Sequence, residues 1–166
     1  MKKLLSILTL TFGIMSLSYS QNTFNWTDTS FQVGQTRNIR LLMAFDGPCT
    51  AKPCYDYSDN KQTYDTLVTF LLNNKDVSLA FIWHTGTAGS SRYNFYYSKR
   101  VAEGLIKELI RLGISEKRMT AIGLGESRPI VSEEELKTIE DKDERLEADR
   151  QNNRIEIIIT SAPNEG

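Results

Sequence analysis

The sequence is short of the residue types that most catalytic and metal-binding sites use. It contains one histidine and two cysteines in 166 residues, and its formal net charge at pH 7 is -1. Such a small net charge argues against a nucleic-acid-binding protein, because neutralising phosphates requires clustered cations. The 40% share of hydrophobic residues suits one ordinary globular domain with a short extra segment.

Long apolar runs are also missing, except at the N-terminus. Two lysines precede an apolar run at residues 4–17, and Ser18 and Ser20 then place small residues at alternate positions. This layout predicts a secretory signal peptide over residues 1–20, and therefore a periplasmic protein whose mature chain has no transmembrane segment. A transmembrane anchor is the alternative, but the run is short for a span of about 20 residues and polar residues interrupt it.

The two cysteines, Cys49 and Cys54, lie close together in the loop GPCTAKPCY. Export to an oxidising compartment predicts that they form a disulfide. A metal site is the alternative, but two thiolates without a nearby histidine or further cysteine cannot fill four coordination positions. We therefore expect a disulfide and no metal. Closing so short a loop contributes about 2 kcal/mol in the chain-entropy model.

The chain contains no recognisable set of catalytic side chains. The single histidine, His84, has no cysteine nucleophile nearby in the sequence, and nine of the 21 acidic residues lie in the charged stretch Glu133–Arg150. No apolar wall is expected there to raise a carboxyl pKa. A strand-end imidazole that holds a turn by hydrogen bonds is the simpler interpretation of His84, with acid–base catalysis as the alternative. The sequence thus predicts a protein that is not an enzyme and binds no cofactor.

The stretch Ser78–Arg100 has the clearest local pattern. Leu79, Phe81 and Trp83 alternate with Ser78, Ala80 and Ile82, and this period of two predicts a strand. A loop rich in Gly, Ser and Thr follows at residues 84–91, and Ser90 or Ser91 is placed to cap a helix. Amide donors at such a corner point outward and suit a carboxylate or another anion.

Periodicity places the remaining elements in order along the chain. We expect a flexible lead-in at 21–30, a short edge strand at 31–33, a core strand at 39–45 with Asp46 at its exit, a helix capped by Ser58 or Asp59 that ends at Asn73 and Asn74, a second helix that ends at Gly113, a third strand from Met119 and a last strand at 154–160. The order predicts an α/β two-layer sandwich, βαβαββ, with a mixed four-stranded sheet covered on one face by two helices.

Two further stretches invite other interpretations. Gly123-Leu124-Gly125 suggests a dinucleotide-binding turn, but the third glycine is missing and Pro129 stands where a helix should open. The charged stretch Glu133–Arg150 predicts a solvated helix with a thin apolar edge or a partly mobile insertion, and a contact surface for a basic partner is the alternative. Residues 161–166 are expected to be a loose tail.

Five motifs occur along the chain in a particular order: HTG at 84–86, YN at 93–94, YSKRVA at 97–102, LIRLGISEKRMTAIGLGESRP at 109–129 and NNRIEI at 152–157. This pattern resembles the OmpA-like peptidoglycan-associating domain family, of the kind found at the C-terminus of OmpA and in Pal. The match runs from about Asn38 to Thr160. It divides the chain into a signal peptide, a lead-in with edge strand at 21–37, an OmpA-like domain at 38–160 with a charged insertion at 133–150, and a tail.

The resemblance also implies a ligand-binding pocket. In the family, an aspartate after the His-Thr pair takes the ammonium of a diaminopimelate residue in the peptidoglycan stem peptide, and an arginine in the next helix takes its carboxylate. Carried over by position, Asp46, Thr85 and Asn94 match, whereas Gly86 replaces the aspartate and Val101 replaces the arginine. Losing two charge-assisted contacts of about 1.5 to 3 kcal/mol each would weaken binding roughly a hundredfold to ten-thousandfold.

Two functions follow from this comparison. The first is a non-enzymatic periplasmic protein of the cell envelope, near the outer membrane, that binds the peptidoglycan stem peptide through a weakened or altered pocket. The alternative is a scaffold that has lost its ligand and serves as a protein-interaction subunit of an envelope complex. The aromatic stretch Tyr93, Phe95, Tyr96 and Tyr97 favours the alternative, since such residues are typical of core packing or protein contacts.

Overall fold

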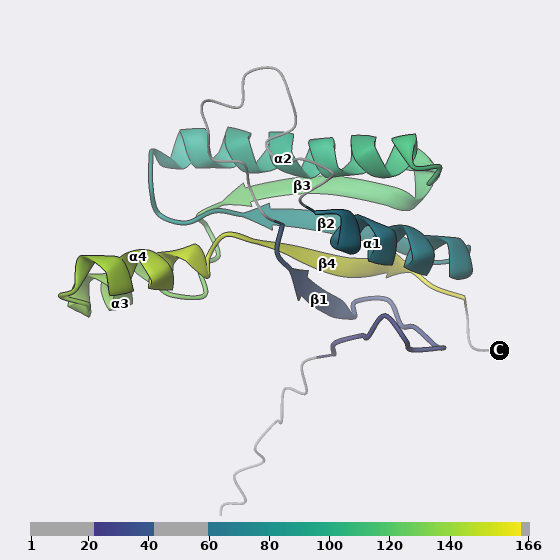
Figure 1. The fold of residues 1–166 in the computed structure, drawn as a ribbon, viewed down its shortest axis with the longest axis horizontal. Helices are drawn as coiled ribbons and strands as arrows, with labels where there is room; N and C mark the ends of the chain where they lie inside the picture. The colour runs from purple at the N-terminus through teal and green to yellow at the C-terminus, as the bar shows by residue number, and fades with distance from the viewer. Residues whose placement is uncertain (1–21, 42–59, 164–166) are drawn as a thin grey trace, which may run out of the picture.

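The computed structural model describes residues 22–41 and 60–163. Within them, four strands form one mixed sheet in the order β1-β4-β2-β3 (Figure 1): β1 (Thr36–Ile39), β2 (Ser78–His84), β3 (Met119–Gly125) and β4 (Arg154–Ser161). β2 and β3 run parallel, and β4 pairs antiparallel with both β1 and β2. The predicted mixed four-stranded sheet is confirmed.

Two long helices, α1 (Lys61–Asn73) and α2 (Ser91–Arg111), share one hydrophobic core with the sheet. Alternate residues of β2 and β4 face this core, as the period of two predicts. The buried set includes Leu79, Phe81, Trp83, Ile155, Ile157 and Ile159 from the strands, Tyr64, Leu67 and Leu71 from α1, and Val101, Leu105 and Leu109 from α2. Full burial of each such side chain contributes about 1.5 to 3 kcal/mol. The predicted two-layer architecture is also confirmed.

Both ends of α2 follow the sequence pattern. Ser90 is the N-cap, and its Oγ accepts a hydrogen bond of 3.3 Å from the Tyr93 amide. At the other end Gly113 has a φ of 95°, and the Ile114 amide donates to the Leu109 carbonyl at 3.0 Å. This is the six-to-one hydrogen bond of a Schellman motif, which requires a left-handed residue at the glycine position.

The glycines of Gly123-Leu124-Gly125 allow α2 to lie close against β3. A Cβ atom on Gly123 would stand 2.1 Å from the backbone nitrogen of Lys99 and 2.6 Å from Ser98 Oγ. The Ser98 hydroxyl is buried and accepts a hydrogen bond of 2.9 Å from the Gly125 amide. These glycines therefore serve close helix–sheet packing.

The N-terminal part of the fold differs from the prediction. Residues 31–33 form no strand; they lead into a turn at Gly34, and pairing begins at Thr36. The predicted flexible lead-in is also wrong, because Phe24 is fully buried and Phe31 nearly so. Both rings pack against Phe70 near the end of α1, with centroids 5.6 and 5.2 Å away. Burial of these rings fixes the segment on the core.

Several predicted features fall beyond the described residues. Residues 42–45 of the predicted core strand, Asp46, Cys49 and Cys54, and the predicted signal peptide all lie outside them, so these stay predictions. The described part of the predicted core strand at 39–45 is wrong, because the strand ends at Ile39 and lies at the edge of the sheet. The N-cap of α1 is Asn60 rather than Ser58 or Asp59. No helix in the described part of the chain is long and apolar enough to cross a membrane.

The charged stretch folds as two short helices, α3 (Glu133–Thr138) and α4 (Lys142–Arg150), instead of the single helix expected. Ser132 and Glu135 form a capping box at the start of α3, and the Asp141 side chain caps α4 through the amides of Asp143 and Glu144. Separate caps explain why the segment breaks into two helices. Both lie beyond one end of the sheet, at the left of Figure 1.

We predict that Gly123→Ala destabilises the protein by about 3 kcal/mol, because the added methyl group forces the α2 backbone away from β3. Gly113→Ala is the matched control: nothing lies within 4 Å of its added Cβ atom, so only its left-handed backbone costs energy, about 1 to 2 kcal/mol. Urea unfolding of both variants measures the difference. A Gly123→Ala variant no less stable than Gly113→Ala would contradict the close-packing interpretation.

Candidate functional site

The predicted site lies at the carboxyl end of β2, where the chain turns toward α2. Thr85 is buried there, and its amide donates to the Gly125 carbonyl at 2.9 Å. Its hydroxyl has no hydrogen-bond partner among the residues that the structure describes. Asn94 is also buried, and its Nδ2 donates to Glu126 Oε2 at 2.5 Å. Both residues support the corner, and their contact with a ligand stays a prediction.

A carboxylate occupies the corner, and it belongs to α4. The Thr87 amide donates to both oxygens of Asp149, at 3.0 and 3.1 Å, across 62 positions of sequence. The neighbouring Gly86 amide donates to Asn153 Oδ1 at 3.1 Å. The amide-lined corner predicted from sequence therefore does hold an anion, and the anion is a side chain of this protein.

The absence of a side chain at Gly86 makes room for this arrangement. A Cβ atom on Gly86 would stand 2.5 Å from Asp149 Oδ2 and 3.0 Å from its Cγ. The Asp149 carboxylate thus fills the space that a side chain at position 86 would enter. The loop after β2 thus meets a carboxylate that comes from α4.

Asn152 holds the end of α4 in position. Its side chain is fully buried, and its Nδ2 donates to Asp149 Oδ1 at 3.1 Å and to the Val131 carbonyl at 3.0 Å. Its Oδ1 accepts from the amides of Ile130 and Val131, at 2.7 and 3.0 Å. Because every polar atom of this amide is used, the loop before α3 and the end of α4 are fixed relative to Asp149.

Val101, the residue in place of the family arginine, contributes no charge to the corner. Its side chain is 1% exposed and belongs to the core between α2 and the sheet. A cation for a ligand carboxylate must therefore come from another position.

His84 is the last residue of β2 and is fully buried, with Nε2 3.2 Å from Glu156 Oε2. Burial lowers the pKa of His84 below its ordinary value of 6.5, and the nearby charge of Arg154 lowers it further, although Glu156 opposes both. At pH 7 the His84–Glu156 contact is thus a hydrogen bond that a neutral imidazole donates to the carboxylate, rather than an ion pair. The geometry favours the structural interpretation of this residue.

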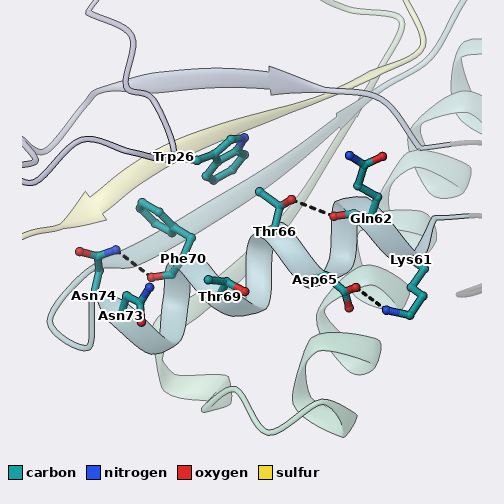
Figure 2. A pocket seen from close by; sticks show the side chains of 9 residues that line it. All are labelled: Trp26, Lys61, Gln62, Asp65, Thr66, Thr69, Phe70, Asn73 and Asn74. Atoms are coloured by element: carbon teal, nitrogen blue, oxygen red, sulfur yellow. Dashed lines mark hydrogen bonds and ion pairs between the residues drawn. The ribbon is translucent and has the colours of Figure 1, made fainter.

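Two hollows of the surface differ in what they offer. The groove along α1 beside Trp26 has a volume of about 570 Å³ (Figure 2). Two of its polar side chains already donate to carbonyls of the same helix, Thr66 to Gln62 and Asn74 to Phe70. A cleft of about 440 Å³ between α3 and α4 reaches Thr87 and Asp149. Among residues 22–41 and 60–163, no three His, Cys, Asp or Glu side chains are grouped to hold a metal ion.

Comparison with known proteins finds similar sequences among outer membrane proteins. The chain is 31% identical to outer membrane porin F of Pseudomonas fluorescens over 98 residues, 59% of this chain and 29% of that protein. It is 34% identical to outer membrane protein A of Klebsiella aerogenes over 74 residues, 43% of this chain and 21% of that protein. The chain thus matches less than a third of the length of these relatives. No family model matches it.

Solved structures share the fold at low sequence identity. The periplasmic domain of Helicobacter pylori MotB superposes with a TM-score of 0.59 at 16% identity, covering 81% of this chain and 78% of that one. The cell wall anchor of the type VI secretion system of Pseudomonas aeruginosa gives 0.53 at 16% identity, covering 76% and 80%. The chain therefore shares its fold with these periplasmic and wall-anchor domains, and it is similar in sequence to part of outer membrane porin F and of outer membrane protein A. The resemblance to the OmpA-like domain family is thereby confirmed.

Asp149, Asn152 and Asn153 were not predicted as site residues. Asn152 and Asn153 belong to the NNRIEI motif, so the motif identified their neighbourhood without revealing what they bind. Asp149 lies in the charged stretch, which composition alone presents as a solvated face.

We predict energetic coupling between positions 86 and 149. Gly86→Ala should displace the Asp149 carboxylate and cost about 1.5 to 3 kcal/mol through the lost hydrogen bonds to Thr87. In an Asp149→Ala background the same change should cost less than about 0.5 kcal/mol, because nothing remains to be displaced. Urea unfolding of the four proteins measures the coupling, and equal costs in the two backgrounds would refute the contact.

The lowered pKa of His84 predicts a pH dependence of stability. The stabilising contribution of the neutral imidazole is complete above the unfolded-state pKa of about 6.5 and is lost as the pH falls through the folded-state pKa. The free energy of unfolding should therefore decrease from pH 7 to pH 5.5, by at most about 1.4 kcal/mol per pH unit. His84→Gln should flatten this slope, and an unchanged slope in the variant would show that another group is responsible.

Proposed function

We propose that this protein is a non-enzymatic component of the bacterial cell envelope, exported to the periplasm by residues 1–20, that associates with peptidoglycan through an altered OmpA-like pocket. The observation that carries the proposal is the Asp149 carboxylate on the Thr87 amide. It puts a negative charge where the resembled family uses one to take the ammonium of the stem peptide.

The altered pocket sets the expected strength of binding. In this proposal Asp149 takes the role of the loop aspartate, so that of the two ionic contacts implied by the family only the arginine contact is missing, at the buried Val101. One missing charge-assisted contact corresponds to binding roughly ten to a hundred times weaker than in the family. The shared fold of a cell wall anchor further supports attachment to the wall.

A protein-interaction function is the second candidate, and one observation favours it. Three aromatic side chains at the start of α2, Tyr93, Phe95 and Tyr96, are 57%, 46% and 55% exposed. Tyr96 also carries the Arg92 guanidinium over its ring, at 5.9 Å from the centroid. Exposed aromatic residues with an adjacent arginine are typical of protein contacts.

Co-sedimentation with purified peptidoglycan sacculi tests the proposal. The wild-type chain should sediment with sacculi in a saturable way, and a Phe95→Ser/Tyr96→Ser variant should sediment equally well because neither side chain lines the cleft that reaches Thr87 and Asp149. A wild-type chain that stays in solution at all sacculus concentrations would reject peptidoglycan association and favour the protein-interaction function. Restoring the family residues is not a usable control, because an aspartate at position 86 would collide with Asp149 and an arginine at position 101 would enter the core.

A further inference from the structure

The cleft between α3 and α4 presents fixed charges of both signs along one helix face. Lys142, Arg145, Leu146 and Asp149 all line it. Their spacing of three, four and seven residues places them in one stripe of α4. At 1.5 Å per residue, Arg145 and Asp149 lie about 6 Å apart along the helix axis.

Arg145 and Asp149 are spaced to form an ion pair within the helix, yet each is held by other groups. Asp149 binds the Thr87 amide and Asn152 Nδ2, and Arg145 Nη1 donates to the Ile139 carbonyl at 3.1 Å. Across the described ranges 22–41 and 60–163, no ion pair joins the two side chains. The cleft thus keeps a carboxylate and a guanidinium apart, each already oriented.

The Asp149 carboxylate can accept further hydrogen bonds. A carboxylate offers about four acceptor sites. Oδ1 accepts from Thr87 and Asn152, whereas Oδ2 only shares the Thr87 amide, at 3.1 Å. Oδ2 therefore has acceptor capacity left for an ammonium group.

The cationic side of the cleft is also available. Lys137 is neutralised by Glu133 at 2.7 Å, but Lys142 has no ion-pair partner in the part of the chain that the structure describes. Lys142 and Arg145 together outnumber the single unpaired carboxylate of Asp149, so the cleft favours a ligand with at least one carboxylate of its own.

We propose that the α3–α4 cleft binds a zwitterionic amino-acid group, with its ammonium on Asp149 and its carboxylate on Lys142 and Arg145. The proposal rests on the proposed function: the ligand is the amino-acid portion of the peptidoglycan stem peptide. The family's pocket has its cation on α2, where this chain has Val101, so the binding site extends from the corner onto α4 instead. The apolar side chains of Leu136 and Leu146, which also line the cleft, would contact the hydrocarbon part of the ligand.

Sacculus co-sedimentation with the full chain tests this site through two pairs of variants. Asp149→Asn removes the charge but keeps an oxygen acceptor for Thr87, and should raise the half-saturating sacculus concentration about tenfold or more. Asp143→Asn, on the same helix but outside the cleft lining, should have no effect. Lys142→Gln should weaken binding about two- to fivefold, since its side chain is exposed, and Lys107→Gln on α2 is its control.

The outcomes separate this proposal from the proposed function. If the wild-type chain binds sacculi and Asp149→Asn binds equally well, the cleft is not the site, while peptidoglycan association stands. If the wild-type chain does not bind, both are overturned. Thermal unfolding establishes that each variant is folded. Should Asp149→Asn fail to fold, Lys142→Gln decides: weaker binding than Lys107→Gln supports the cleft, and equal binding overturns it.

Discussion

The carboxylate of Asp149 on the amide of Thr87 is the contact on which the functional corner depends. It joins the loop after β2 to the end of α4, two segments separated by 62 positions in the sequence. A charge-assisted hydrogen bond of this kind contributes about 1.5 to 3 kcal/mol. It is possible only because Gly86 has no Cβ atom and because the buried Asn152 holds the helix end in place. Loop, helix end and the strand that follows are therefore one unit.

The rest of the fold provides a rigid support for that unit. Gly123 lets the α2 backbone lie against β3, and the buried Ser98 hydroxyl joins the two through the Gly125 amide. Asn94, in the first turns of α2, bonds Glu126 from the loop after β3. These contacts set where the corner lies relative to the sheet. The corner can then receive a carboxylate from α4.

The sequence was sufficient for the architecture because its signals are local. Alternation in β2 and β4, the serine cap and Gly113 of α2, and the order of elements each follow from neighbouring residues, and the observed elements agree closely. The N-terminal segment was mispredicted because the burial of Phe24 and Phe31 depends on Phe70 of α1, which no local pattern encodes. Asp149 was missed for the same reason. The composition of its segment is that of a solvated helix, and only the tertiary fold places Asp149 beside Gly86. The glycine at position 86 therefore gave no sign that the fold brings a carboxylate of α4 to this loop.

Hydrogen exchange of the Thr87 amide, followed by NMR in the wild type and in Asp149→Ala, tests the central claim most directly. The account predicts that this amide is protected in the wild type and exchanges much faster in the variant, while amides of β2 and β3 keep their protection. An amide that exchanges equally fast in both proteins would show that the carboxylate does not occupy the corner in solution.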